Sequence, residues 1–198
     1  MLPAETSIYL LRHGQTQWNV KGRYQGGLDS PLTEKGKQQA RDSGRKLARH
    51  LNNASRCQIV SSPQGRALHT AELVALELGC DPQCVQTDPR LKEISFGEWE
   101  GKTMDEIKRE YPDEFVARTN DRWRVAPPQG ESYSGVATRL KSWSHDLVVS
   151  GHCIVVSHGC TGRILRGLIG DLSLQEISSL DEAHENIYRL SNESCELL

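Results

Sequence analysis

The sequence predicts an α/β fold: a single three-layer α/β/α domain with a mostly parallel sheet and a small helical insertion at about residues 98–131. Short apolar runs alternate with amphipathic stretches along most of the 198-residue chain, which is typical of strand–helix–strand units packed into a parallel sheet. The length also suits one hydrophobic core, because domains usually contain about 100–200 residues. We therefore expect residues 1–198 to form one domain.

The first half of the chain contains two strand–helix pairs. Residues 7–11 (SIYLL) predict the first strand, and residues 31–53 predict a helix with Thr33 as its N-cap. Residues 57–62 (CQIVSS) predict the second strand, and residues 63–79 the next helix, which begins with proline and ends with glycine. Spacings of three and four residues give each helix an inward face, namely Ala40, Gly44, Leu47, Ala48 and Leu51 in the first and Ala67, Ala71, Val74, Ala75 and Leu78 in the second.

The second half of the chain is less regular before the same pattern returns. Residues 84–87 and 90–94 suggest short extended pieces. Residues 98–131 predict an insertion rather than a second domain, with two short helices and then a loop that its prolines keep extended. After the insertion we expect a helix, a strand, a helix and a last strand, over residues 133–150, 153–157, 160–170 and 186–191.

The composition argues against several classes of partner. Lys and Arg total 24 and Asp and Glu total 26, so a formal charge of -2 gives no overall field that would attract nucleic acid or an anionic membrane. We find neither a signal-peptide pattern nor an apolar run near the ~18 residues of a membrane span. Six cysteines without C-x-x-C pairs favour reduced thiols in a cytosol. We expect a cytoplasmic protein with no nucleic-acid or membrane partner, and a homodimer stays open.

Three polar segments follow predicted strands at the ends where those strands stop. Arg12 and His13 follow the first strand, residues 62–66 follow the second, and His158 and Gly159 follow a later one. In an open α/β sheet, ligands bind outside the carboxyl ends of the strands, so we expect the three segments to form one crevice. Two arginines, two histidines and free N–H groups at helix starts suit a dianion such as a phosphoryl group.

Each of these signals has a simpler interpretation when taken alone. An Arg-His-Gly turn is usually a capped strand end, and Arg66 alone would more often be a surface arginine. His13 and His158 could instead bind a metal, but two nearby arginines would repel a divalent cation. We therefore predict no metal and no cofactor.

Five segments between Leu10 and Gly159 resemble the motifs of the histidine phosphatase superfamily, also called the phosphoglycerate mutase-like family. They are LLRHGQTQWNVKGRYQGGLDSPLTEKGKQQA, SSPQGRALHTAE, LKEISFGEWEG, PPQGES and VSHG, in the family's order. Arg-His-Gly by itself is a poor marker, but the five together are highly specific. Two small departures are Cys160 directly after VSHG and Gln129 before Gly130 in PPQGES.

The resemblance implies a role for each matching residue. His13 matches the nucleophile that becomes phosphorylated, and Glu93 matches the proton donor. Arg12, Arg66 and His158 match the residues that hold the phosphoryl oxygens. The candidate substrate-binding residues are Asn19, Gln25, Gly26, Arg23 and Gly159.

Elementary chemistry agrees with these roles. A neutral imidazole can attack phosphorus, and surrounding positive charge both offsets the transition-state oxygens and keeps His13 from protonating. The leaving alkoxide needs a proton from a carboxylic acid, and the same group, once ionised, can draw a proton from the water that attacks phosphohistidine. Glu93 would do both, and burial beside Phe96 and Trp99 would favour its protonated form.

The motifs leave three functions open. We expect a metal-independent phosphomonoester hydrolase that acts on a small phosphorylated metabolite. The alternatives are a cofactor-dependent phosphoglycerate mutase-type phosphotransferase, which must exclude water with a lid, and a non-catalytic member that only binds a phosphorylated partner. Few residues remain to build a lid, which favours the hydrolase. The rest of the substrate could meet a rim formed by Trp18, Arg23, Tyr24, Trp99, Arg118, Arg122, Trp123 and Arg124, or these could be ordinary packing and solvated charge.

Two residues outside these roles are further candidates. Cys160 would begin a helix, and that position could lower the pKa of its thiol and make it sensitive to oxidation. His184 precedes the last predicted strand and could reach the crevice.

Overall fold

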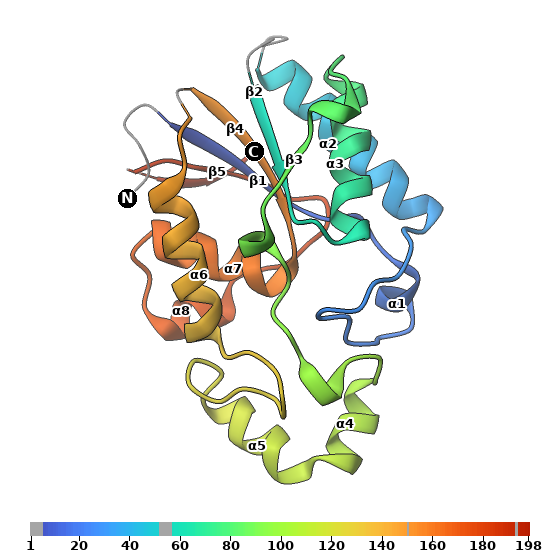
Figure 1. Cartoon of the computed structure of the whole chain (residues 1–198), viewed down its shortest axis with the longest axis vertical. Coiled ribbons are helices and arrows are strands. Elements are labelled where there is room, and N and C mark those ends of the chain that lie inside the picture. The colour runs from blue at the N-terminus through green and yellow to red at the C-terminus, as the bar shows by residue number, and fades with distance from the viewer. Residues whose placement is uncertain (1–5, 52–56, 150, 193) are drawn as a thin grey trace.

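A six-stranded sheet runs through the middle of the molecule, in the order β3-β2-β4-β1-β5-β6 (Figure 1). The computed structural model describes residues 6–51, 57–149, 151–192 and 194–198. Strands β1 to β4 are parallel to one another, whereas β5 is antiparallel to β1 and β6 to β5. The predicted mostly parallel sheet is confirmed. Its strands are β1 Ser7–Arg12, β2 Cys57–Ser61, β3 Gln86–Thr87, β4 His152–Ser157, β5 Ile187–Leu190 and β6 Cys195–Leu197.

Helices cover both faces of the sheet, which gives the three layers that the sequence predicts (Figure 1). Helices α2 and α3 pack together on one face, and α6 and α7 pack together on the other. Gly44 of α2 allows a close approach, because a Cβ there would lie 2.7 Å from the Glu77 Cβ of α3. The helices are α1 Gln17–Val20, α2 Glu34–His50, α3 Gly65–Glu77, α4 Met104–Glu110, α5 Pro112–Asn120, α6 Tyr133–Asp146, α7 Gly159–Ile169 and α8 Leu174–Ser179.

The strand β1 shows how the sequence divides the core between the two faces. Successive side chains of a strand point to opposite faces. Ile8 and Leu10 accordingly join the cluster under α6 and α7, whereas Tyr9 and Leu11 join the cluster under α2 and α3. All of these side chains are buried, and burial of one large apolar side chain contributes about 1.5–3 kcal/mol. The strand is therefore fixed from both sides, and so is the position of the residues that follow it.

Several element boundaries differ from the prediction. Thr33 is the N-cap of α2 as expected, with its Oγ accepting from the Gly36 N–H at 3.0 Å, and residues 52 and 53 lie outside the described chain. Helix α6 ends at Asp146, because Leu147 leaves the helix with extended backbone and packs into the core. Residues 84–87 contain only the short strand β3, and 90–94 start in a 3-10 helix over Pro89–Leu91. The short elements α1, α8 and β6 are additions to the prediction.

The predicted helical insertion is confirmed. A 3-10 helix over Gly97–Trp99 leads into α4 and α5, and a loop then returns to Ser132, the N-cap of α6. Figure 1 shows α4 and α5 at the lower end of the molecule, beyond the main α/β body. The insertion therefore extends the domain at one end.

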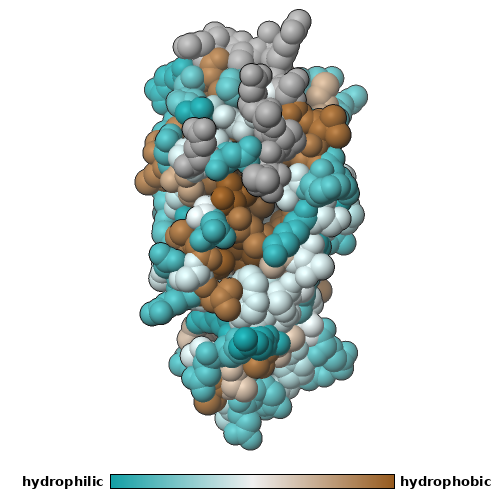
Figure 2. All heavy atoms as spheres, turned by 90° about the vertical axis from the view of Figure 1, so that its left-hand side faces the viewer, coloured by the Kyte–Doolittle hydropathy of each residue, from teal (hydrophilic) through white to brown (hydrophobic). Residues whose placement is uncertain are grey.

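Figure 2 shows the side of the molecule that forms the left of Figure 1, where hydrophobic side chains gather near the middle and hydrophilic ones surround them. Within the described ranges, no helix combines the length and the apolar composition needed to cross a membrane.

Candidate active site

The carboxyl ends of β1, β2 and β4 bring together the segments that the sequence singled out. The registers place Arg12 beside Ser157 and Ser61 beside Val156. Backbone hydrogen bonds continue one residue further, from the His13 N–H to Ser157 O and from the Ser62 N–H to Val156 O, both at 2.9 Å. The predicted convergence of the three segments is therefore confirmed.

His13 is held as a neutral imidazole with one nitrogen available. Its ring Nδ1 lies 2.8 Å from the Gly14 carbonyl oxygen, which only accepts, so Nδ1 carries the proton and Nε2 keeps its lone pair. Burial lowers the pKa of His13 well below its ordinary value, and the charges of Arg12 and Arg66 lower it further. The side chain has the protonation state that a nucleophile requires.

Three buried nitrogens beside His13 have no hydrogen-bond partner among the described residues. They are Arg12 Nε, Arg66 Nε and His158 Nδ1. His158 lies next to His13, with ring centroids 5.2 Å apart, and its Nε2 is 2.8 Å from the Ser62 hydroxyl. An unpartnered buried donor costs roughly 1–3 kcal/mol, which an anion placed among these groups would offset.

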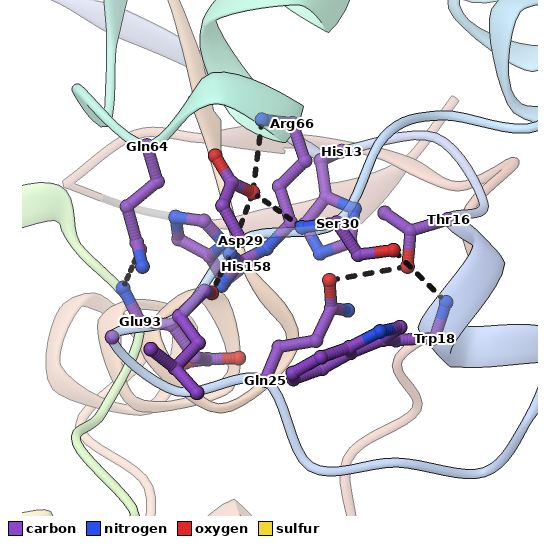
Figure 3. Close-up of polar contacts among 12 residues, drawn as sticks. His13, Thr16, Trp18, Gln25, Asp29, Ser30, Gln64, Arg66, Glu93 and His158 are labelled. Atoms are coloured by element: carbon purple, nitrogen blue, oxygen red, sulfur yellow. Dashed lines mark hydrogen bonds and ion pairs between the residues drawn. The ribbon is translucent and has the colours of Figure 1, made fainter. Parts of the chain in front are cut away.

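Arg66 is fixed by the loop that precedes α2. Its Nη1 donates to Leu28 O at 2.7 Å and to Asp29 Oδ1 at 3.0 Å, and its Nη2 donates to Gly26 O at 3.0 Å. The side chain is fully buried. Figure 3 shows Arg66 beside His13, with Asp29 next to it. These bonds hold the guanidinium in one orientation.

Glu93 is held by hydrogen bonds from the first residues of α7 and by Gln64, in the loop that precedes α3. Its Oε1 accepts from the Thr161 N–H at 3.0 Å and the Thr161 hydroxyl at 3.1 Å, and its Oε2 accepts from the Cys160 N–H at 3.3 Å. The Gln64 carboxamide accepts from the Glu93 N–H at 2.8 Å and donates to Gly26 O at 2.7 Å (Figure 3). The expected neighbours Phe96 and Trp99 line the same cavity, but the Glu93 carboxyl accepts hydrogen bonds from backbone N–H groups and from the Thr161 hydroxyl. Glu93 is thus a firmly positioned carboxyl group.

A cavity of about 430 Å³ opens onto these residues. Arg12, His13, Arg66 and Glu93 line it, whereas His158 is almost fully buried behind them and lines a small neighbouring cavity of about 20 Å³. The larger of these two volumes, about 430 Å³, is suited to a small metabolite or part of one.

The five candidate substrate-binding residues fall into two groups. Asn19, Gln25, Gly26 and Arg23 line the large cavity, whereas Gly159 lines the small one with His158. Side chains of the first group already form hydrogen bonds with other residues of the chain. The Asn19 side chain forms the capping box of α1 with Thr16, the Gln25 Oε1 accepts from the Thr16 hydroxyl at 3.1 Å (Figure 3), and Arg23 Nη1 donates to Gly101 O and to Glu106 at 3.0 Å.

The outer wall of the cavity carries part of the predicted rim. Arg118 is buried and lies 5.8 Å from the Phe96 ring centroid and 5.7 Å from the Tyr133 ring centroid. Of the predicted rim residues, Arg23, Tyr24, Trp99, Arg118 and Arg122 line the cavity, and Trp18, Trp123 and Arg124 do not.

The two further candidates have opposite outcomes. The expectation of a lowered Cys160 pKa is wrong: burial raises the pKa of this thiol, and the carboxylates of Glu93 and Glu182 raise it further. Burial therefore outweighs the effect of the helix start. His184 reaches the backbone beside the crevice, where its Nδ1 lies 2.6 Å from the His13 carbonyl oxygen, but its side chain is not among those that line the cavity.

Sequence reasoning missed several residues that support the site. Ser62 and Gln64 stand inside the SSPQGR motif, so their position after a strand was a usable signal. Thr161 stands one turn into the helix after VSHG. Glu182 gave no local signal, because its carbonyl accepts from Arg12 Nη1 across 170 residues of sequence.

Comparisons with known proteins agree with the motifs. A family model described as the histidine phosphatase superfamily (branch 1) matches residues 8–198. The chain belongs to this superfamily. A protein named probable phosphoglycerate mutase GpmB, from Cronobacter sakazakii, is 39% identical over 170 residues, which cover 82% of this chain and 74% of that protein.

Solved structures of this histidine phosphatase fold superpose closely on the chain. Bacillus stearothermophilus YhfR is 33% identical with a TM-score of 0.81, over 97% of this chain and 95% of that one. A mycobacterial glucosyl-3-phosphoglycerate phosphatase, in complex with VO3, is 29% identical with a TM-score of 0.80, over 97% and 96%. The predicted fold and family are confirmed.

Proposed function

We propose that this histidine phosphatase family member is a metal-independent phosphomonoester hydrolase that acts on a small phosphorylated metabolite through a phosphohistidine intermediate. One observation carries the proposal: a neutral His13 lies among three unpartnered buried nitrogens, those of Arg12, Arg66 and His158. A phosphoryl group placed there would accept from all three while its phosphorus faces the imidazole.

In the first half-reaction, His13 Nε2 attacks phosphorus and the ester P–O bond breaks. Arg12, Arg66 and His158 offset the charge on the peripheral oxygens, so no metal is needed for that purpose. Glu93 gives its proton to the leaving alkoxide. The products are phosphohistidine, a free alcohol and an ionised Glu93.

In the second half-reaction, water attacks the phosphohistidine. Glu93 takes a proton from the water, the P–N bond breaks, and inorganic phosphate forms. Neutral His13 and protonated Glu93 are restored.

The mutase alternative deserves a direct test, because one relative carries a phosphoglycerate mutase name. A mutase must keep water away from the intermediate. Of the segment beyond the strand ends, Phe115, Arg118 and Thr119 of α5 line the cavity. The products formed therefore decide between hydrolysis and transfer.

The test is a screen of phosphomonoesters with EDTA present, including 3-phosphoglycerate, sugar phosphates and nucleoside monophosphates. We expect release of inorganic phosphate, and acid-labile phosphate on the protein after a rapid quench. His13→Asn should abolish both, whereas His145→Asn, at an exposed position, should change neither. Interconversion of phosphoglycerates that depends on added bisphosphoglycerate, with no phosphate release, would establish the mutase instead. Phosphate binding without phosphohistidine would indicate a non-catalytic member.

A further inference from the structure

The loop over residues 180–186, between α8 and β5, packs against the residues that follow β1. The Glu182 carbonyl oxygen accepts from Arg12 Nη1, and Arg163 pairs with the Glu182 carboxylate at 2.7 Å. The His184 Nδ1 lies 2.6 Å from the His13 carbonyl oxygen. A carbonyl only accepts, so Nδ1 is the donor. A loop far along the chain thus contacts both the nucleophile and its neighbouring arginine.

The bond from His184 completes a clamp on the peptide unit between His13 and Gly14. The oxygen of this unit accepts from His184, and its N–H, which belongs to Gly14, donates to the Thr70 Oγ at 3.1 Å. The next carbonyl, Gly14 O, accepts from the His13 ring at 2.8 Å. The direction of the imidazole therefore depends on this backbone, which α3 holds from one side and the loop from the other.

His184 does not line the cavity, so it would act through His13 rather than on substrate. Its ring centroid is 5.6 Å from that of His13. The pKa of His184 is lowered to about 4, first by burial and then by the charge of Arg12. The bond to the His13 carbonyl and the charge of Glu185 raise this pKa, and Lys35 lowers it. At neutral pH the ring is uncharged and can donate to the carbonyl without adding a cation beside the nucleophile.

We propose that His184 is a positioning residue, which orients the imidazole of His13 for attack by holding the His13 carbonyl. This inference rests on the proposed function. The role of His184 differs from that of Glu93. A misdirected nucleophile lowers the rate of phosphoryl transfer from every substrate, whereas loss of the acid lowers the rate least for a substrate with a good leaving group.

The experiment compares His184→Ala, His184→Asn and His184→Gln with the wild-type chain. An asparagine amide can occupy the place of Nδ1, whereas a glutamine amide reaches the place of Nε2. We expect alanine and glutamine to lower the rate of phosphohistidine formation by about 10- to 100-fold, and asparagine to restore it to within about 3-fold. The loss should be equal for 4-nitrophenyl phosphate and for an alkyl phosphate, with the inhibition constant of vanadate nearly unchanged.

Thermal unfolding of each variant separates positioning from stability, and His145→Ala is the matched control because its ring is exposed. A folded His184→Ala with wild-type rates overturns the inference and leaves the hydrolase intact. Equal loss in the alanine and asparagine variants, or a loss confined to the alkyl phosphate, also overturns it. A wild-type chain that forms no phosphohistidine removes the proposed function and this inference together.

Discussion

At the scale of single residues, Arg66 binds the loop before α2 with some of its guanidinium nitrogens and leaves another for a ligand. Its two terminal nitrogens donate to the carbonyls of Gly26 and Leu28 and to Asp29, whereas Nε has no partner in the part of the chain that the structure describes. Planar geometry makes this division possible, because a guanidinium presents its donors in a fixed fork. A lysine would keep the charge without the fork.

Arg66→Lys should therefore lower kcat/KM by about 100-fold or more, which corresponds to roughly 3 kcal/mol of lost transition-state stabilisation. The inhibition constant of vanadate should rise in parallel, because the same donor is missing for both ligands. Steady-state kinetics and vanadate titration measure the two effects. Arg124→Lys is the control, since its side chain is 77% exposed. A variant at position 66 within 3-fold of wild type would contradict the role of Nε.

At the scale of elements, one carboxylate joins the insertion to the loop that holds Arg66. Glu100 Oε1 accepts from the Gly27 N–H at 2.8 Å, the Phe96 N–H at 3.0 Å and the Ser95 hydroxyl at 3.2 Å. Gly26 fits beside it only without a side chain, because its φ is +52° and a Cβ would lie 2.2 Å from that oxygen. The Glu100 carboxylate thus links the loop of Gly26 and Gly27 to the start of the insertion at Ser95 and Phe96.

We expect Glu100→Ala to weaken this link and to leave the chemistry in place. KM should rise about 3- to 10-fold with kcat within about 3-fold, and the free energy of unfolding should fall by about 0.5–1.5 kcal/mol, because one exposed and two part-buried donors lose their acceptor. Kinetics and urea unfolding are the measurements. Glu114→Ala, on the exposed surface of α5, should change neither quantity. A large fall in kcat with unchanged KM would show that Glu100 acts on the phosphoryl end instead.

The elements also show which parts of the site could be predicted from the sequence. Arg12, His13 and His158 follow strongly apolar strands, and the rule that parallel strands end at one edge brought them together. Glu182 could not be placed this way, because its bond to Arg12 depends on how a loop after α8 folds back. His184 was expected near the crevice from its place before the last strand, but its bond to the His13 carbonyl depends on the same loop. The pKa of Cys160 was misjudged for a similar reason, since burial by distant segments decides it.

The short elements escaped prediction because their own sequences hold too few hydrophobic positions to show a period. Helix α1 is one turn long, and a capping box between Thr16 and Asn19 forms its start. Helix α8 begins with a capping box between Ser173 and Glu176 and buries only Ile177. Capping and tertiary contacts, rather than hydrophobic periodicity, define such helices.

At the scale of the whole molecule, the fold keeps three histidines uncharged near the carboxyl ends of β1 and β4. The pKa values of His13 and His158 are lowered well below 6.5, mainly by burial, and that of His184 is lowered to about 4, also mainly by burial. His158 and His184 both lie beside His13, with ring-centroid distances of 5.2 Å and 5.6 Å. The folded chain therefore resists protonation at these rings, whereas the unfolded chain does not.

This difference makes folding stability depend on pH in a known direction. Between the unfolded pKa of about 6.5 and the lower folded values, the unfolded state binds more protons, so the free energy of unfolding falls as pH falls. Each of the three histidines contributes up to about 1.4 kcal/mol per pH unit below pH 6.5. Carboxylates with lowered pKa values, such as Asp88, lose their contribution only at lower pH and do not obscure this window.

Urea unfolding between pH 5 and 7.5 should accordingly show constant stability above about pH 7 and a steep loss below pH 6.5. His158→Asn should make the slope below pH 6.5 shallower by up to about 1.4 kcal/mol per pH unit, because one proton fewer is taken up on unfolding. His145→Asn, whose side chain is 90% exposed, should leave the slope unchanged. A wild-type stability that is flat or rising from pH 6.5 to 5 would mean that the folded chain accepts protons at these rings, and the neutral nucleophile on which attack at phosphorus depends would then be lost.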